Sequence, residues 1–68
     1  MMRISYNKLW KMLIDKEMKK SDLREKAGIS SASLAKLGKG DNITTDVLLR
    51  ICEVIDCRIE DILETIRE

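Results

Sequence analysis

The chain has 68 residues, no histidine and no proline, so it can form one compact domain but offers few groups for catalysis. Residues 1–39 carry ten lysines and arginines against four acidic side chains (+6), whereas residues 40–68 carry three against eight (−5). This asymmetry suggests a basic face that meets an anionic polymer, although an ordinary solvated surface would also explain it. We expect a single, non-enzymatic domain over residues 1–68, cytoplasmic because no apolar run could cross a bilayer.

The first predicted helix begins after Ser5, a competent N-cap, and covers residues 6–16. Its apolar residues form a stripe that is wider than one core contact requires. Trp10 and Ile14 lie on the flank of this stripe. They would either form a homodimer interface or be covered within the monomer by the C-terminal helix through Ile66. The sequence leaves both possibilities open.

Two short helices joined by a turn are predicted next. The second helix covers Lys20–Ala27, and Gly28 supplies the left-handed conformation that ends it. Ser30 is the expected N-cap of the third helix, Ser31–Leu37. The apolar residues on the inner side of this unit are Leu23, Ala27, Ile29, Leu34 and Leu37. This spacing is typical of a helix-turn-helix, whose second helix enters the major groove of DNA, but a plain αα-hairpin has the same periodicity.

Two further helices complete an all-α prediction of five helices. The fourth begins after Thr44 or Thr45 and is expected to bury Leu48, Ile51, Cys52 and Ile55. Residues 56–58 interrupt the helical period. The fifth helix runs from Ile59 to near the C-terminus, with Ile62, Leu63 and Ile66 facing inward.

Cysteine usage gives no sign of a metal or redox site. Cys52 and Cys57 are five residues apart and fit neither a C-x-x-C motif nor a zinc-binding spacing. Because they lie among isoleucine and valine, we expect buried, reduced thiols. No serine lies in a nucleophile-elbow context either. The sequence therefore predicts no enzyme, metal site, cofactor or small-molecule ligand.

The segment 18–40, with its turn Ala27-Gly28-Ile29-Ser30, resembles the helix-turn-helix motif of Cro/CI-type regulators, also called the XRE family. Residues 48–63 resemble the last two helices of that family, and within it the chain is most similar to small stand-alone regulators of the VanU type. The resemblance covers residues 5–66. It implies a lambda-repressor-like domain that binds double-stranded DNA and regulates transcription, as a repressor or modulator.

The resemblance also implies roles for individual residues. The third helix would read bases through Ser31, Ala32, Ser33 and Lys36, and phosphates would be bound by Lys20 and Lys39. The chemistry agrees, because lysine donates to guanine O6 and N7, hydroxyls pair with several base edges, and a methyl group can contact thymine. A solvated Lys36 that contacts only phosphate is the alternative.

Three features depart from the family pattern. Arg24 stands where many members have alanine, and Leu13 and Gly38 replace an ion pair that commonly joins the first and third helices. The side chains of the reading face are short, which would make base specificity modest and partly dependent on DNA shape. A second hypothesis is a module that keeps the fold but acts by pairing with another regulator. The wide apolar first helix and the acidic C-terminal half suit that hypothesis equally well.

Overall fold

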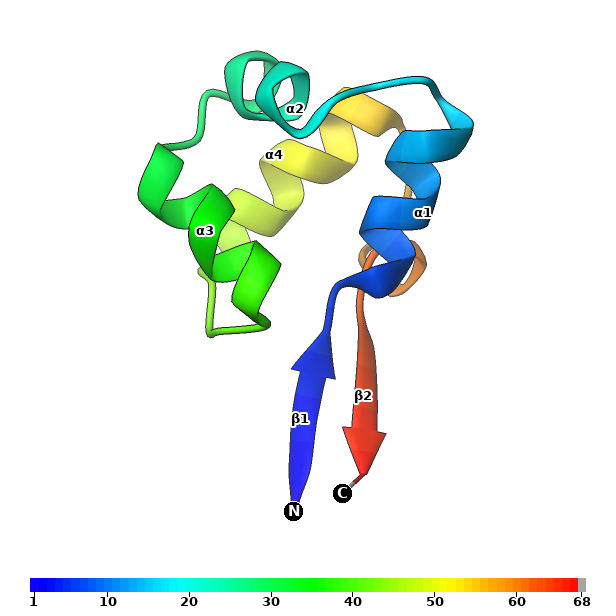
Figure 1. Ribbon diagram of the computed structural model, residues 1–68, viewed down its shortest axis with the longest axis vertical. Helices are drawn as coiled ribbons and strands as arrows, with labels where there is room; N and C mark the ends of the chain where they lie inside the picture. The colour runs from blue at the N-terminus through cyan, green and yellow to red at the C-terminus, as the bar shows by residue number, and fades with distance from the viewer. Residues whose placement is uncertain (68) are drawn as a thin grey trace.

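The structure is a computed structural model that describes residues 1–67. Its elements in chain order are β1 (Met2–Ser5), α1 (Asn7–Asp15), α2 (Lys20–Ala27), α3 (Ser31–Lys39), α4 (Thr45–Ile55), the 3-10 turn η1 (Ile59–Asp61) and β2 (Glu64–Arg67). The helices form one body, and the two strands run side by side away from it (Figure 1). The longest helix, α4, has 11 residues, and none of the helices in residues 1–67 has the length and hydropathy that a membrane span requires.

The centre of the hydrophobic core contains one large, completely buried side chain from each main segment. The fully buried set is Leu9, Leu23, Leu37, Ile51 and Ile62, which come from α1, α2, α3, α4 and the residue after η1. All four residues that were predicted to be buried in the fourth helix, Leu48, Ile51, Cys52 and Ile55, are buried. The helical amphipathicity in the sequence therefore identifies the core-facing side of α4 correctly.

All four α-helices end in the same way. A left-handed residue directly follows α2, α3 and α4, namely Gly28, Gly40 and Asp56, with φ of 65°, 73° and 51°. In α1 the left-handed residue is Glu17, with φ of 54°, one position beyond the C-cap Lys16. The N–H of the residue after each one donates to the carbonyl five residues earlier, at 2.9 to 3.1 Å. This Schellman arrangement satisfies carbonyls that the helix end would otherwise leave unpaired. The stop predicted at Gly28 is confirmed.

The predicted fifth helix, from Ile59 to near the C-terminus, is wrong. Residues 1–67 form a mainly helical domain, as predicted, but with four α-helices and a small two-stranded sheet instead of five helices. The chain makes only the short turn η1 and then extends into β2, which pairs antiparallel with β1 in the register Met2↔Arg67, Arg3↔Ile66, Ile4↔Thr65 and Ser5↔Glu64. Ile4, Thr65 and Ile66 are β-branched and favour an extended backbone. Although Ile62 and Ile66 have helical spacing, the C-terminal segment therefore forms a strand, because it pairs with β1 at the other end of the chain.

This correction also removes one explanation for the surplus apolar residues of α1. Ile66 lies opposite Arg3 in the sheet, so within residues 1–67 no C-terminal helix folds back over Trp10 and Ile14. Ile14 is 74% exposed. On this flank of α1, Ile14 is therefore open to solvent, whereas Trp10 is half-buried.

Smaller differences concern where helices begin and end. α1 begins at Asn7 with Tyr6 at its N-cap, so the predicted cap, Ser5, lies one residue too early. Ser5 is the last residue of β1, and its hydroxyl accepts from the Asn7 N–H at 3.3 Å. α3 continues two residues past Leu37, because Gly40 rather than Gly38 takes the left-handed conformation.

The end of α4 brings the two cysteines together. Both are free thiols, Cys52 buried and Cys57 half-buried. Burial raises the pKa of Cys57 to about 11, and the neighbouring Cys52 and the Asp61 carboxylate add to this shift. Because the neutral thiol is favoured in the fold, its contribution to stability is present below the ordinary pKa of 9.0 and is lost as the pH rises toward 11.

We therefore expect Cys57 to react slowly with iodoacetamide at pH 8 and faster as the pH approaches 11, because the thiolate is the nucleophile. Peptide mass spectrometry across the pH range gives the rate for each cysteine. In denaturant the rate should rise near the ordinary thiol pKa instead. A midpoint near that ordinary value in the folded protein would contradict the burial of this thiol.

Candidate nucleic-acid interface

α2, the turn at Gly28 and α3 form a helix-turn-helix whose local signals agree with the sequence. The Ser30 hydroxyl caps α3 by accepting from the Ser33 N–H at 3.1 Å. Four of the five residues predicted for the inner side are buried, namely Leu23, Ala27, Ile29 and Leu37, whereas Leu34 is half-buried. The two helices and the turn therefore present a fixed angle between α2 and α3.

Arg50 of α4 braces this turn, which the sequence analysis did not foresee. Its Nη1 donates to the carbonyl oxygen of Gly28 at 3.3 Å, and its Nε lies 3.1 Å from the Asp46 carboxylate. Asp46 and Arg50 are four residues apart on α4, the spacing that places side chains on one helix face. From the sequence, this spacing predicts only the ion pair between Asp46 and Arg50. It does not predict that the guanidinium also reaches the turn at Gly28.

The outward side of α3, which we call the α3 outer face, carries two adjacent rows of exposed residues. One row is Ala32, Lys36 and Lys39, and the other is Ser31, Ala35 and Gly38. A Cβ at Gly38 would meet nothing within 4 Å. Apart from the two lysines, all these side chains are small. This face can therefore approach another surface closely and meet it with positive charge.

Ser33 differs from the other residues that were predicted to read bases. It is half-buried, and its hydroxyl oxygen accepts from the Ser30 hydroxyl at 3.1 Å. Ser31, Ala32 and Lys36 are exposed on the α3 outer face. The hydroxyl of Ser33 is therefore engaged in the helix cap, whereas these three side chains are open to solvent.

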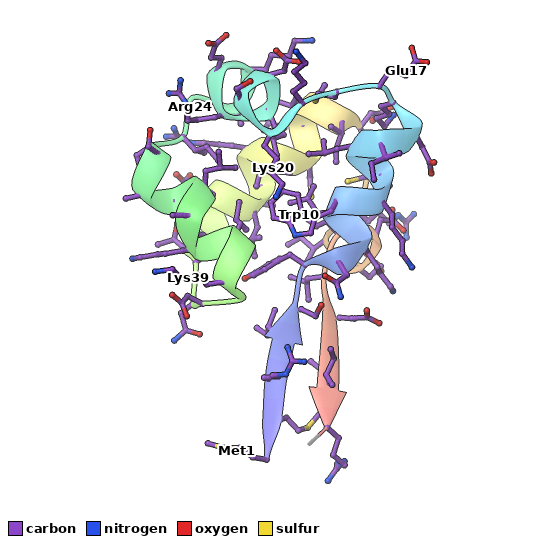
Figure 2. All side chains as sticks on the ribbon, viewed as in Figure 1. Met1, Trp10, Glu17, Lys20, Arg24 and Lys39 are labelled. Carbon is purple, nitrogen blue, oxygen red and sulfur yellow. The ribbon has the colours of Figure 1, made fainter. Side chains whose placement is uncertain are left out.

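Lys20 and Lys39, the residues that were predicted to bind phosphate, lie at helix ends. Lys39 is the last residue of α3, and Lys20 is the first residue of α2 (Figure 2). The ammonium of Lys20 lies 4.4 Å from the centre of the Trp10 ring. Within residues 1–67, Lys20, Lys36 and Lys39 form no ion pair, so no carboxylate neutralises their charges.

A groove of about 660 Å³ opens between α1 and the start of α2. Trp10 and Ile14 both line it, with Leu13 and Met18 beside them and Lys19 and Lys20 among its polar residues. Trp10 is half-buried, whereas Ile14 is exposed. The groove is thus mainly apolar and has two cations in its wall. In residues 1–67 no group of three or more histidine, cysteine, aspartate or glutamate side chains is placed to hold a metal ion.

The departures at Leu13, Gly38 and Arg24 have simple structural outcomes. Leu13 is buried in the core, and Gly38 lies on the α3 outer face. The ion pair that commonly joins these positions in the family is therefore replaced by core packing at one end and by open surface at the other. Arg24 is half-buried, and its guanidinium lies 4.0 Å from the Glu25 carboxylate.

Comparisons with known proteins agree with this geometry. The family model of the Cro/C1-type HTH DNA-binding domain matches residues 8–68. The crystal structure of the transcriptional regulator VanUg is similar to this chain with a TM-score of 0.95 and 55% sequence identity, over 98% of this chain and 89% of that one. No curated protein sequence matches the chain. The resemblance seen in the sequence around the Ala27–Ser30 turn is confirmed.

Proposed function

We propose that this chain, which belongs to the Cro/C1-type helix-turn-helix DNA-binding family, regulates transcription by inserting α3 into the major groove of a specific DNA site. The observation that carries the proposal is the α3 outer face, a surface of small side chains and two unpaired lysines on a helix whose entry turn is braced by Arg50. A regulator of this kind acts by occupying DNA as a repressor or modulator, and its function requires no catalysis.

The proposed contacts divide into reading and anchoring. Lys36 lies near the middle of the α3 outer face, where its ammonium can donate to guanine O6 and N7, with Ser31 and Ala32 beside it as shorter readers. Lys20 and Lys39 stand at helix ends, where they would hold the phosphates on either side of the groove. Ser33 would contribute mainly by fixing the start of α3 through its hydrogen bond with Ser30.

Single alanine substitutions separate these roles. Lys36→Ala should relax the preference at one base pair by about 1–3 kcal/mol, because it removes a base contact. Lys20→Ala and Lys39→Ala should weaken binding to all sequences alike and lower the slope of log K against log salt by about one each. Selection of a site from random duplexes, followed by titration at several salt concentrations, measures both quantities.

Arg58→Ala is the matched control, because it removes one exposed cation that lies outside the helix-turn-helix. It should leave both base preference and salt slope close to those of the wild type. Equal losses on every sequence for all three lysine variants would refute Lys36 as a reader. If random selection yields no consensus, the sequence-specific function itself is wrong.

The groove favours a second element of the proposal, a homodimer through Trp10 and Ile14. Nine residues make α3 about 13 Å long, so one copy would touch only a few base pairs, and two-fold dimers double that contact. Lys20 covers one face of the Trp10 ring, so Ile14 would supply most of the apolar surface of this dimer interface. The same groove could instead receive another regulator, which is the interaction-module alternative.

Ile14→Glu should shift a wild-type dimer to the monomer in sedimentation experiments, because it places a charge in the apolar contact. Leu49→Glu is the control, since Leu49 is 52% exposed on α4 and lies outside the groove. A wild type that is monomeric both free and on DNA would exclude the homodimer. Dissociation by both variants would show that the contact is not located at the groove.

A further inference from the structure

The contact between Trp10 and Lys20 joins the first helix to the DNA-binding unit. The Lys20 ammonium lies over the indole ring at 4.4 Å from its centre, well within the range of about 6 Å for a cation–π interaction. Figure 2 shows the two side chains meeting in the space between α1 and α3. The chain has one tryptophan, one tyrosine and no phenylalanine, and Tyr6 is buried. Trp10 is therefore the aromatic ring available to an exposed cation.

Both partners are held by their own helices. Trp10 lies in the first turn of α1 and packs against the core cluster, and its backbone N–H donates to the Tyr6 carbonyl at 3.3 Å. Lys20 begins α2, whose start is fixed because the Asp22 carboxylate accepts from the Lys19 N–H at 3.1 Å. The ring and the base of the lysine side chain thus have fixed positions before any ligand arrives.

An aromatic ring holds a lysine differently from a carboxylate. A carboxylate would also restrict the side chain, but it would neutralise the charge and compete with a phosphate for the ammonium. The ring attracts the cation through its quadrupole and leaves the full positive charge in place. A lysine that is already restricted loses less rotamer freedom when it binds. In residues 1–67 this ring contact is found at Lys20 and not at Lys36 or Lys39.

We propose that Trp10 is a positioning residue for DNA binding, whose ring holds the Lys20 ammonium where it meets a backbone phosphate. This inference rests on the proposed function, because it assumes that Lys20 contacts DNA. Trp10 itself need not touch the nucleic acid. The contribution that Trp10 makes through Lys20 must disappear when the ammonium is removed, whereas a contribution through the proposed dimer contact does not depend on Lys20.

A double-mutant cycle tests this dependence. Trp10→Leu should weaken DNA binding about three- to fivefold without changing the salt slope, because Lys20 still reaches the phosphate but is less restricted. Lys20→Ala should weaken binding and lower the slope by about one. Under conditions where sedimentation shows that Trp10→Leu leaves the oligomeric state unchanged, it should have no further effect in the Lys20→Ala background. An equal loss in both backgrounds would show a merely structural role for Trp10 and overturn the inference.

The free protein provides a readout that does not involve DNA. In the wild type, the ring current of Trp10 should shift the ε-CH₂ proton resonances of Lys20 upfield, and Lys20→Arg should retain DNA affinity because the guanidinium also stacks on indole. Unshifted Lys20 resonances would overturn the inference even if Trp10→Leu does not fold. Trp10→Phe serves as a milder variant and should give a smaller loss, since phenylalanine binds cations more weakly than tryptophan.

The two levels of the proposal fail in different ways. If the wild type shows no salt-dependent DNA binding, the proposed function is wrong, whatever the Lys20 resonances show. If the wild type binds DNA and Lys20→Ala lowers the salt slope, but Trp10→Leu acts equally in both backgrounds, only the positioning role of Trp10 is wrong.

Discussion

Leu23→Ala is expected to lower the free energy of unfolding by about 3–5 kcal/mol. Leu23 is completely buried in α2, which packs chiefly against α4, and truncation leaves a cavity that these helices cannot close. A 68-residue domain has a total stability of roughly 3–10 kcal/mol. The variant should therefore be partly unfolded at 25 °C. Urea titration followed by far-UV circular dichroism measures the loss.

Leu49→Ala is the matched control for this substitution, because it makes the same chemical change at a side chain of α4 that is 52% exposed. It should change stability by less than about 0.5 kcal/mol. DNA affinity should fall for Leu23→Ala only as far as the folded fraction falls, since Leu23 is completely buried and is not part of the α3 outer face. Similar losses for both variants would contradict the packing of α2 on α4.

The helix-turn-helix was predictable because its signals are local. Gly28 adopts the left-handed conformation, Ser30 caps α3 and Leu23 and Ala27 are buried four residues apart, as the sequence indicates. Each of these features depends on neighbours within a few residues. The exposed face of α3 then follows from helical periodicity, and so does the candidate reading surface.

The small sheet was missed because its pairing is the most distant in the chain. β1 and β2 have four residues each and come from opposite ends of the sequence. They are not joined by a hairpin turn, whose residues would have indicated the strand pairing. The segment around Ile62 and Ile66 satisfies helical spacing equally well. Whether this segment forms a helix or a strand depends on the presence of a partner strand, and no local sequence pattern indicates that partner.

The sequence predicted where the candidate site residues lie on the helices, but not the contacts that support them. The positions of Lys20, Lys36 and Lys39 follow from helix ends and faces. The contacts of Arg50 with the Gly28 carbonyl and of Lys20 with Trp10 join separate elements and depend on tertiary packing. Sequence spacing within one helix cannot reveal them. The hydrogen bond between the Ser30 and Ser33 hydroxyls is different, because the two residues are three apart and the N-cap position of Ser30 was itself predicted.

Gly40→Ala is expected to destabilise the protein by about 2–4 kcal/mol, because two effects add at this position. Gly40 has a φ of +73°, where a side chain is strained. A Cβ there would also lie 3.1 Å from the backbone carbonyl oxygen of Ile4, which belongs to β1. The end of α3 therefore packs directly on the N-terminal strand, and the added methyl must displace backbone rather than a flexible side chain.

Gly28→Ala separates these two effects, because it shares the strain without the close contact. Gly28 has a φ of +65°, and a Cβ there would meet the flexible Arg50 guanidinium at an ordinary 3.9 Å. Gly28→Ala should lower the free energy of unfolding by about 1–2 kcal/mol, because only the backbone strain contributes. Thermal and urea unfolding of both variants gives the difference, and equal losses would mean that β1 does not press on the end of α3. A larger loss of stability at Gly40 would show that the strand pair fixes the end of α3, where Lys39 precedes the glycine.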